Sequence, residues 1–259
     1  MKKLMSVVAA VTCGVAIAAD GSGIQSSNCV GYNHSAMAED GYGVIAATFE
    51  DVGKATIDIQ NILPVSEEAG EDIGDGSYDI QTIKPDGTMS EQFSYKTVHE
   101  DNVAKNGWYD ANDQLAKKTL TLGEGLWYYS YWANSSLLFS GEVEMGAIDM
   151  PLCEDGYGVT GVARPAGINI QDILPISDEA GEDVGDGSYD VQTIKPDGTM
   201  NEQFSYKTVH EDNVEKDGWY DANDKLATKD LAAGEGLWYY SYWGGSFFRL
   251  KALDAKDAE

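Results

Sequence analysis

The sequence has few basic residues, few cysteines and, beyond its first eighteen residues, no long apolar run. Lys and Arg total 17 against 44 Asp and Glu, which gives a formal net charge of −27. A charge of this sign and size repels nucleic acid and anionic lipid, so we expect no nucleic-acid partner. Without another apolar run of about 18 residues, we also expect no membrane insertion of the mature chain.

The single apolar run lies at the start and is typical of a secretory signal peptide. Lys2 and Lys3 precede the apolar residues 4–18, which end in the small-x-small pattern Ala16-Ile17-Ala18. We therefore expect residues 1–18 to be removed and the protein to be secreted, to the periplasm, the cell surface or the extracellular space. Removal takes away two lysines and no acid, so the net charge moves from −27 to −29.

The small number of cysteines and histidines limits redox and zinc chemistry. Of three cysteines, Cys29 and Cys153 remain after the signal peptide, and an exported pair favours a disulfide. The two do not occupy equivalent positions in the repeat described below, so the pairing stays open. The three histidines and these cysteines lack the spacing of a zinc site.

Motifs for catalysis are also missing. The chain has no Gly-x-Ser-x-Gly elbow and no glycine-rich phosphate loop between a strand and a helix. With 44 acidic residues, some pair of carboxylates always lies at the separation that glycosidases use, so acid pairs carry no information. We expect no enzymatic activity and no cofactor, with calcium as the one ion worth testing.

An internal repeat dominates the rest of the chain. Residues 57–132 return at 168–243, an offset of 111, with 14 differences in 76 positions. This period is too long for a solenoid and has the size of a small domain. We predict domains at 26–139 and 140–250, followed by a polar tail at 251–259. No Pro/Gly/Ser-rich linker separates them, so we expect the domains to pack directly together.

Within each copy the hydrophobic period is mostly two. The stretches YDIQTI and FSYKTV flank Pro85-Asp86-Gly87, which predicts a hairpin over 78–98. One helical turn is predicted over 58–63, ended by Pro64. The fold class is therefore all-β: two tandem homologous domains, each a β-sandwich or barrel with one short helical turn.

The order of the motifs VGYN, GYGVIAATF, IQNILP, YDIQTI, GWYD and GEGLWYYS resembles uncharacterised secreted bacterial proteins built from tandem β-rich repeats. In those proteins a Gly-Tyr/Trp-Asn segment opens each unit and a Gly-Glu-Gly-aromatic strand closes it. The resemblance covers nearly the whole mature chain. It implies a β-rich fold, and it brings no known activity or catalytic residue.

The repeated segment LWYYSYW places aromatic rings on both faces of one strand. We expect one set to be core: Trp127, Tyr129 and Tyr131, with Trp238, Tyr240 and Tyr242 in the second copy. The opposite face and a nearby Trp-Tyr pair are the candidate contact surface for the sister domain, another subunit or a sugar ring. That candidate surface comprises Trp108, Tyr128, Trp132, Trp219, Tyr239 and Trp243.

Acidic residues cluster in SEEAGEDIGDGSYD and its repeat. Calcium takes six to eight oxygen ligands from flexible loops, so such a segment is a candidate site. The spacing is not that of an EF-hand, and a solvated acidic loop is the alternative. The candidate ligands are Glu71, Asp72, Asp75, Asp79, Glu182, Asp183, Asp186 and Asp190.

These features predict an exported, non-catalytic structural or interaction protein of the bacterial cell surface or extracellular matrix. Its partners are then other surface proteins or further copies of itself. The alternative is a bivalent carbohydrate-binding protein that uses the duplicated aromatic strand, with a polysaccharide as partner.

Overall fold

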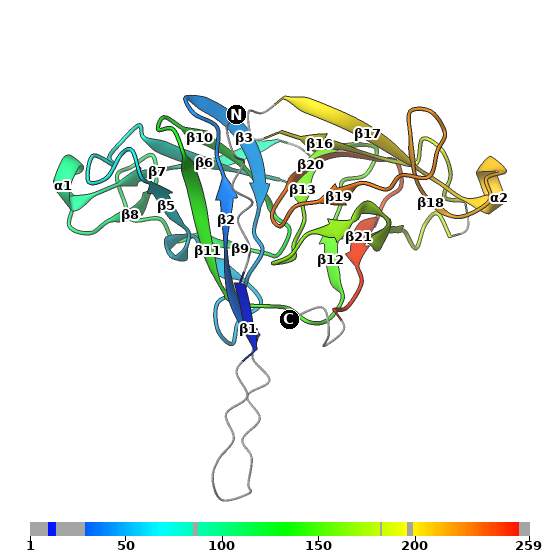
Figure 1. Ribbon diagram of the computed structural model, residues 1–259, viewed down its shortest axis with the longest axis horizontal. Helices are drawn as coiled ribbons and strands as arrows, with labels where there is room; N and C mark the ends of the chain where they lie inside the picture. The colour runs from blue at the N-terminus through cyan, green and yellow to red at the C-terminus, as the bar shows by residue number, and fades with distance from the viewer. Residues whose placement is uncertain (1–9, 14–28, 85–87, 182, 196–198, 254–259) are drawn as a thin grey trace, which may run out of the picture.

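The computed structural model describes residues 10–13, 29–84, 88–181, 183–195 and 199–253, and these ranges form an all-β protein (Figure 1). Strands make up 47% of the structure and helices 6%, which confirms the predicted fold class. None of the helices in these ranges is long and apolar enough to cross a membrane.

The first copy follows β1 (Ala10–Cys13) along the chain. Its elements are β2 (Cys29–Ala36), β3 (Gly41–Ala46), β4 (Ile57–Asp58), η1 (Ile59–Asn61), β5 (Leu63–Ser66), β6 (Tyr78–Ile83), β7 (Met89–Lys96), α1 (Val98–Asp101), β8 (Gly107–Tyr109), β9 (Thr119–Leu120), β10 (Gly125–Ser130) and β11 (Ser135–Glu142).

The second copy repeats this order. Its elements are β12 (Ile148–Pro151), β13 (Gly156–Gly161), β14 (Ile168–Asn169), η2 (Ile170–Asp172), β15 (Ile173–Ile176), β16 (Tyr189–Ile194), β17 (Met200–Lys207), α2 (Val209–Asp212), β18 (Gly218–Asp221), β19 (Asp230–Leu231), β20 (Gly236–Ser241) and β21 (Phe247–Leu250). The segment between β11 and β12 joins the two copies, a few residues beyond the predicted boundary at 139.

Each copy has two main sheets, one of five strands and one smaller, besides a two-stranded sheet formed by β4 and β9 or by β14 and β19. The five-stranded sheets have the orders β3-β10-β6-β7-β8 and β13-β20-β16-β17-β18, and the smaller sheets β1-β2-β11-β5 and β12-β21-β15. The matching orders show that the duplicated sequence adopts one fold twice. In Figure 1 the five-stranded sheets lie in the upper half of the molecule, with α1 and α2 at opposite ends.

The core of each copy lies between its two sheets. In the first copy, Ile80, Phe93 and Tyr128 from the five-stranded sheet belong to the same buried cluster as Leu137 and Phe139 from β11. The second copy has an equivalent cluster. This arrangement is a β-sandwich, because each sheet buries one face against the other and turns its second face outward.

Two short helical elements flank the strands of each copy. The 3-10 turn η1 lies within the predicted turn at 58–63, and the Asp58 side chain caps it by accepting from the backbone N–H of Gln60. Helix α1 is an addition to the sequence prediction of one helical turn per copy. It begins after Thr97, whose side chain accepts from the backbone N–H of Glu100.

The two copies contact each other through equivalent positions. Ile45 forms a β-bridge with Glu235, and Thr160, which is equivalent to Ile45, forms one with Glu124. This reciprocal exchange is the pattern of an interface with two-fold symmetry. Beside it, the N–H of Ala46 donates to the carbonyl of Gly234 at 3.1 Å. The prediction that the domains pack directly together is confirmed.

The Gly-Glu-Gly turns allow this close approach. A Cβ atom on Gly125 would lie 2.8 Å from the carbonyl oxygen of Val159, and one on Gly236 would lie 2.5 Å from that of Val44. Around these glycines, a small apolar cluster joins the copies. It consists of Val44, Ile83, Val159 and Ile194, with Trp127 and Trp238 packed against it.

A buried arginine ties the joining segment to the end of the second copy. Arg164 is buried, and its guanidinium donates to the carbonyl oxygens of Glu144, Gly146 and Lys251. Burial lowers its pKa. The equivalent residue of the first copy is Phe49, which is also buried. The two copies therefore fill one core position with different chemistry.

Two partly buried carboxyl groups have raised pKa values. Glu235 lies at the contact between the copies, and burial is the main cause, with Glu202 adding to it. Burial also raises the pKa of Glu50, followed by repulsion from Glu144 and Glu142. Ionising either group therefore costs more in the folded protein than in the unfolded chain.

A side chain at the inter-domain glycine should weaken the contact. We expect Gly125→Val to cost about 1–3 kcal/mol through overpacking, which lowers Tm by about 2–4 °C per kcal/mol in a protein of this size. Calorimetry on this variant and on Ala104→Val, which introduces a valine at an exposed position, measures the effect. Equal Tm values for the two variants would contradict the close approach of Gly125 to the second copy.

The raised pKa values predict a pH dependence of stability. Below the ordinary carboxyl pKa of about 4.3, these groups are protonated in both the folded and the unfolded chain. As the pH rises from there through the higher pKa values of the folded protein, the free energy of unfolding decreases. Glu235→Gln removes one such group. We expect its Tm to match that of the parent at low pH and to exceed it by a few degrees at neutral pH. A variant with lower Tm at neutral pH would refute this.

Candidate functional site

The outer faces of the five-stranded sheets carry aligned aromatic and polar side chains. In the first sheet, the register places Tyr129 between Tyr42 and Asp79, and Trp127 between Val44 and Gln81. We call this surface the first tyrosine face: Tyr42, Asp79, Gln81, Gln92, Ser94, Trp127, Tyr129 and Tyr131. The second tyrosine face has the same residue types: Tyr157, Asp190, Gln192, Gln203, Ser205, Trp238, Tyr240 and Tyr242.

Four tyrosine rings on these faces are open to solvent. Tyr42 and Tyr131 are 63% and 53% exposed, and Tyr157 and Tyr242 are 58% and 50% exposed. The tryptophan of each face is half-buried because it packs on the apolar cluster between the copies. The domain contact therefore covers one end of each face and leaves the tyrosine end open.

The tyrosine rings are held in place by one another and by an aspartate. The centroids of Tyr42 and Tyr129 lie 5.0 Å apart with a tilt of 44°, and those of Tyr157 and Tyr240 lie 5.1 Å apart. The Tyr129 hydroxyl donates to Asp40 Oδ1 at 2.9 Å. Burial, followed by this bond to Asp40, raises the pKa of Tyr129 to about 12. The phenol is thus a neutral donor throughout the physiological pH range.

Polar groups border the rings. On the first face, the Ser94 hydroxyl donates to Asp79, and the Gln81 amide nitrogen donates to the carbonyl of Ser90 at 3.3 Å. Gln92 is exposed beside them. A sheet surface with rings, amides and a carboxylate offers both stacking area and hydrogen-bonding groups to a ligand.

The structure reverses the predicted faces of the aromatic strand. The expected core rings Trp127, Tyr129 and Tyr131 point outward, as do Trp238, Tyr240 and Tyr242. The candidate contact surface is instead covered. Trp108, Trp219, Tyr128 and Tyr239 are buried, and Trp132 and Trp243 are half-buried against the cores. Both parts of that prediction are wrong.

Two features explain the reversal. Tyr128 packs over Gly43, where a Cβ atom would lie 2.4 Å from the phenol oxygen, so the glycine makes room for the ring inside the sandwich. The neighbouring strand β6 buries Tyr78 and Ile80 and turns Asp79 outward. Because paired residues share a face, this alternation places Tyr129 on the outside. The polar alternation of YDIQTI is the signal that identifies the outer face.

Trp108 has a separate structural role. It belongs to β8 rather than to a loop, and its Nε1 donates to the carbonyl of Ile62 at 2.7 Å. Trp219 makes the same bond to Ile173 at 2.8 Å. Each indole therefore fills the core and also satisfies a buried carbonyl group.

Four of the predicted calcium ligands that the structure describes already have other partners. Asp75 pairs with Lys96 at 3.2 Å, whereas Asp79 lies on β6 and accepts from Ser94. Asp186 and Asp190 make the equivalent contacts with Lys207 and Ser205. Glu182 lies outside the described residues. Calcium binding by these loops remains a prediction, and the structure favours the alternative of solvated acidic loops.

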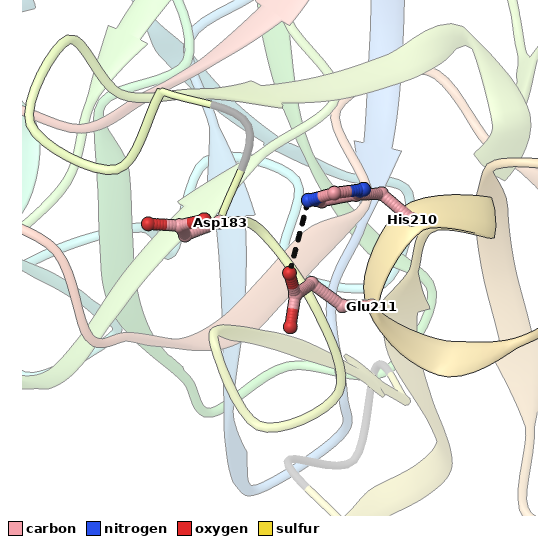
Figure 2. A group of neighbouring side chains, drawn as sticks. All are labelled: Asp183, His210 and Glu211. Atoms are coloured by element: carbon pink, nitrogen blue, oxygen red, sulfur yellow. Dashed lines mark ion pairs between the residues drawn. The ribbon is translucent and has the colours of Figure 1, made fainter.

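One acidic group includes a histidine. Asp183, His210 and Glu211 place one ligand atom each within 4.8 Å of one another at an exposed position (Figure 2). Figure 2 shows His210 and Glu211 projecting from helix α2 toward the loop of Asp183, with the ion pair at 3.4 Å. All three side chains are exposed, which is typical of a solvated surface as much as of a cation site.

The cysteine prediction stays open. Cys153 is buried, and its N–H donates to the Tyr239 hydroxyl at 3.1 Å. The backbone of Cys29 lies opposite Cys13 in the register of β1 and β2. The side chain of Cys29 lies outside the described part of the structure, so a Cys29–Cys153 disulfide remains a prediction.

Comparison with known proteins found no match. No protein-family model, no curated protein and no solved structure matches the chain. The resemblance to secreted tandem-repeat proteins therefore remains a prediction, and function is argued from the geometry of the tyrosine faces.

The acidic loops generate a test with calcium. We expect melting curves in millimolar calcium and in chelator to superimpose, because Asp75 and Asp186 already pair with lysines and the Asp183 group is solvated. A rise in Tm with calcium that Asp183→Asn abolishes would contradict this expectation and locate a cation site.

Proposed function

We propose that the protein is an exported, non-catalytic interaction protein that binds a polysaccharide through its two tyrosine faces. The observation that carries the proposal is the set of four exposed tyrosines on the outer faces of the two five-stranded sheets. This is the carbohydrate-binding alternative of the sequence analysis, moved to the opposite face of the aromatic strand.

Exposed rings in this number need a partner to explain them. Burying a large side chain gains roughly 1.5–3 kcal/mol, and Tyr42, Tyr131 and their equivalents forgo much of this gain. Single exposed apolar residues are ordinary on protein surfaces, but grouped aromatic rings mark contact sites. Tyr42 packs against Tyr129, and Tyr157 against Tyr240, with ring centroids about 5 Å apart, which supports a binding surface.

Sugar rings suit both parts of these faces. The C–H surface of a sugar stacks on an aromatic ring, while its hydroxyls bond to amides and carboxylates at the border. Asp79, Gln81 and Gln92 provide such groups on the first face. The net charge of −27 repels anionic polymers, so a neutral polysaccharide is the expected ligand class.

The duplication makes the protein bivalent. The copies are joined by hydrogen bonds and an apolar cluster rather than by a tether, so the faces keep one relative placement. Two weak sites on one body gain affinity through effective concentration when both reach the same polymer. A polysaccharide presents its repeat unit many times, which is the kind of ligand that such an arrangement favours.

Removing the exposed rings should abolish binding without unfolding the protein. We expect Tyr42→Ala with Tyr131→Ala to weaken retention on insoluble neutral polysaccharides by about a hundredfold or more, through loss of avidity. Adding Tyr157→Ala and Tyr242→Ala should abolish retention. These side chains are at least half exposed, so Tm should change little.

Val98→Ala is the matched control, because Val98 is an exposed apolar side chain on α1, outside the tyrosine faces. It should retain the binding of the parent protein. A parent protein that no neutral polysaccharide retains, or a quadruple variant retained as well as the parent, would refute the proposal.

A further inference from the structure

The outer edge of β2 is occupied by a strand from the start of the chain. β1 pairs with β2 in antiparallel fashion, with Ala10 opposite Tyr32 and Cys13 opposite Cys29. On its other side, β2 pairs with β11 along almost its whole length. β1 is thus the only cover of this edge among the residues that the structure describes.

β1 lies within residues 1–18, the expected signal peptide. This inference rests on the export that the proposed function includes, because export removes these residues from the mature protein. The backbone N–H and C=O groups of residues 29–32 that bond to β1 then lose their partners. An edge of this kind is a template for pairing with another strand.

The equivalent edge of the second copy is protected in a different way. β12 has four residues, and they include Asp149 and Pro151. Arg249 holds Asp149 with two bonds of 2.7 Å. A short strand with a proline and a charge is a poor template for pairing. The second copy therefore blocks its edge without help from any other segment.

β2 has none of these protections. It has eight residues and contains no Asp, Glu, Lys, Arg or Pro. Val30 and Tyr32 expose apolar surface along it. In a mature chain with a net charge of −29, an uncharged strand is a place where two copies approach without local charge repulsion.

We propose that in the mature protein the β2 edge pairs with the β2 edge of a second copy. Two identical strands related by a two-fold axis normal to the sheet run antiparallel, which is the direction that this edge already accepts from β1. The smaller sheets then join into one continuous sheet in the order β5-β11-β2-β2-β11-β5. The dimer presents four tyrosine faces, since these lie on the other sheet of each sandwich.

The test measures the mass of the mature chain by light scattering. A chain that begins at Ala19 should double its mass as its concentration rises from micromolar to millimolar. Hydrogen exchange should become slower at β2 over the same range and stay constant at β12. A chain that keeps residues 1–18 should protect β2 at all concentrations without a change in mass.

Two variants of the mature chain separate edge pairing from other association. Tyr32→Lys places a charge on the edge and should keep the protein monomeric. Val52→Lys makes the same change in charge at an exposed loop position and should leave the dimer intact. Circular dichroism should show that both variants are folded.

A mature chain that stays monomeric at millimolar concentration would overturn the proposal. So would a dimer that persists in Tyr32→Lys with unchanged exchange at β2. Polysaccharide retention is read separately on the monomeric variant. Retention without dimers would support the proposed function and refute the pairing of β2 edges. Dimers without retention would support the pairing and refute the proposed function.

Discussion

The packing of Tyr128 over Gly43 is the interaction on which the rest of the structure depends. It places one side of β10 inside the first sandwich, and Tyr239 over Gly158 does the same for β20. Strand alternation then determines which face each neighbouring residue occupies, because a shift by one residue would exchange every side chain between core and solvent. The exposed tyrosines are therefore a consequence of how the core is filled.

The contact between the copies converts two such sheets into one body. The glycines of the Gly-Glu-Gly turns let the backbones approach at equivalent positions, and Trp127 and Trp238 cover the apolar cluster beside them. Each outer face is thus divided into a covered end and an open end. The Gly-Glu-Gly turn that precedes the aromatic strand in each copy is therefore also the point where the two domains meet.

The strands and the duplication were predictable because both depend on local patterns. The period of two in YDIQTI and FSYKTV and the offset of 111 residues suffice for the hairpin and the two like domains. The face of β10 was not predictable from β10 alone, since aromatic residues occupy both of its sides. That information lies in the register with β6 and in Gly43, which are long-range features.

Helix α1 depends on the cap at Thr97. The buried position of Arg164 depends on carbonyl groups that are distant in the chain, such as that of Lys251. Short capped helices and pairings of this kind lack a sequence period of their own. The contact surface predicted from the sequence lies on the side of the aromatic strand that the structure buries.

Oxidative footprinting of the tyrosines tests this account most directly. The folded protein is exposed briefly to hydroxyl radicals, and the modified residues are identified by mass spectrometry. Rapid modification of Tyr42, Tyr131, Tyr157 and Tyr242, with Tyr128 and Tyr239 modified only after unfolding, is the predicted result. Rapid modification of Tyr128 and Tyr239 in the folded protein, with the four outer rings protected, would contradict it.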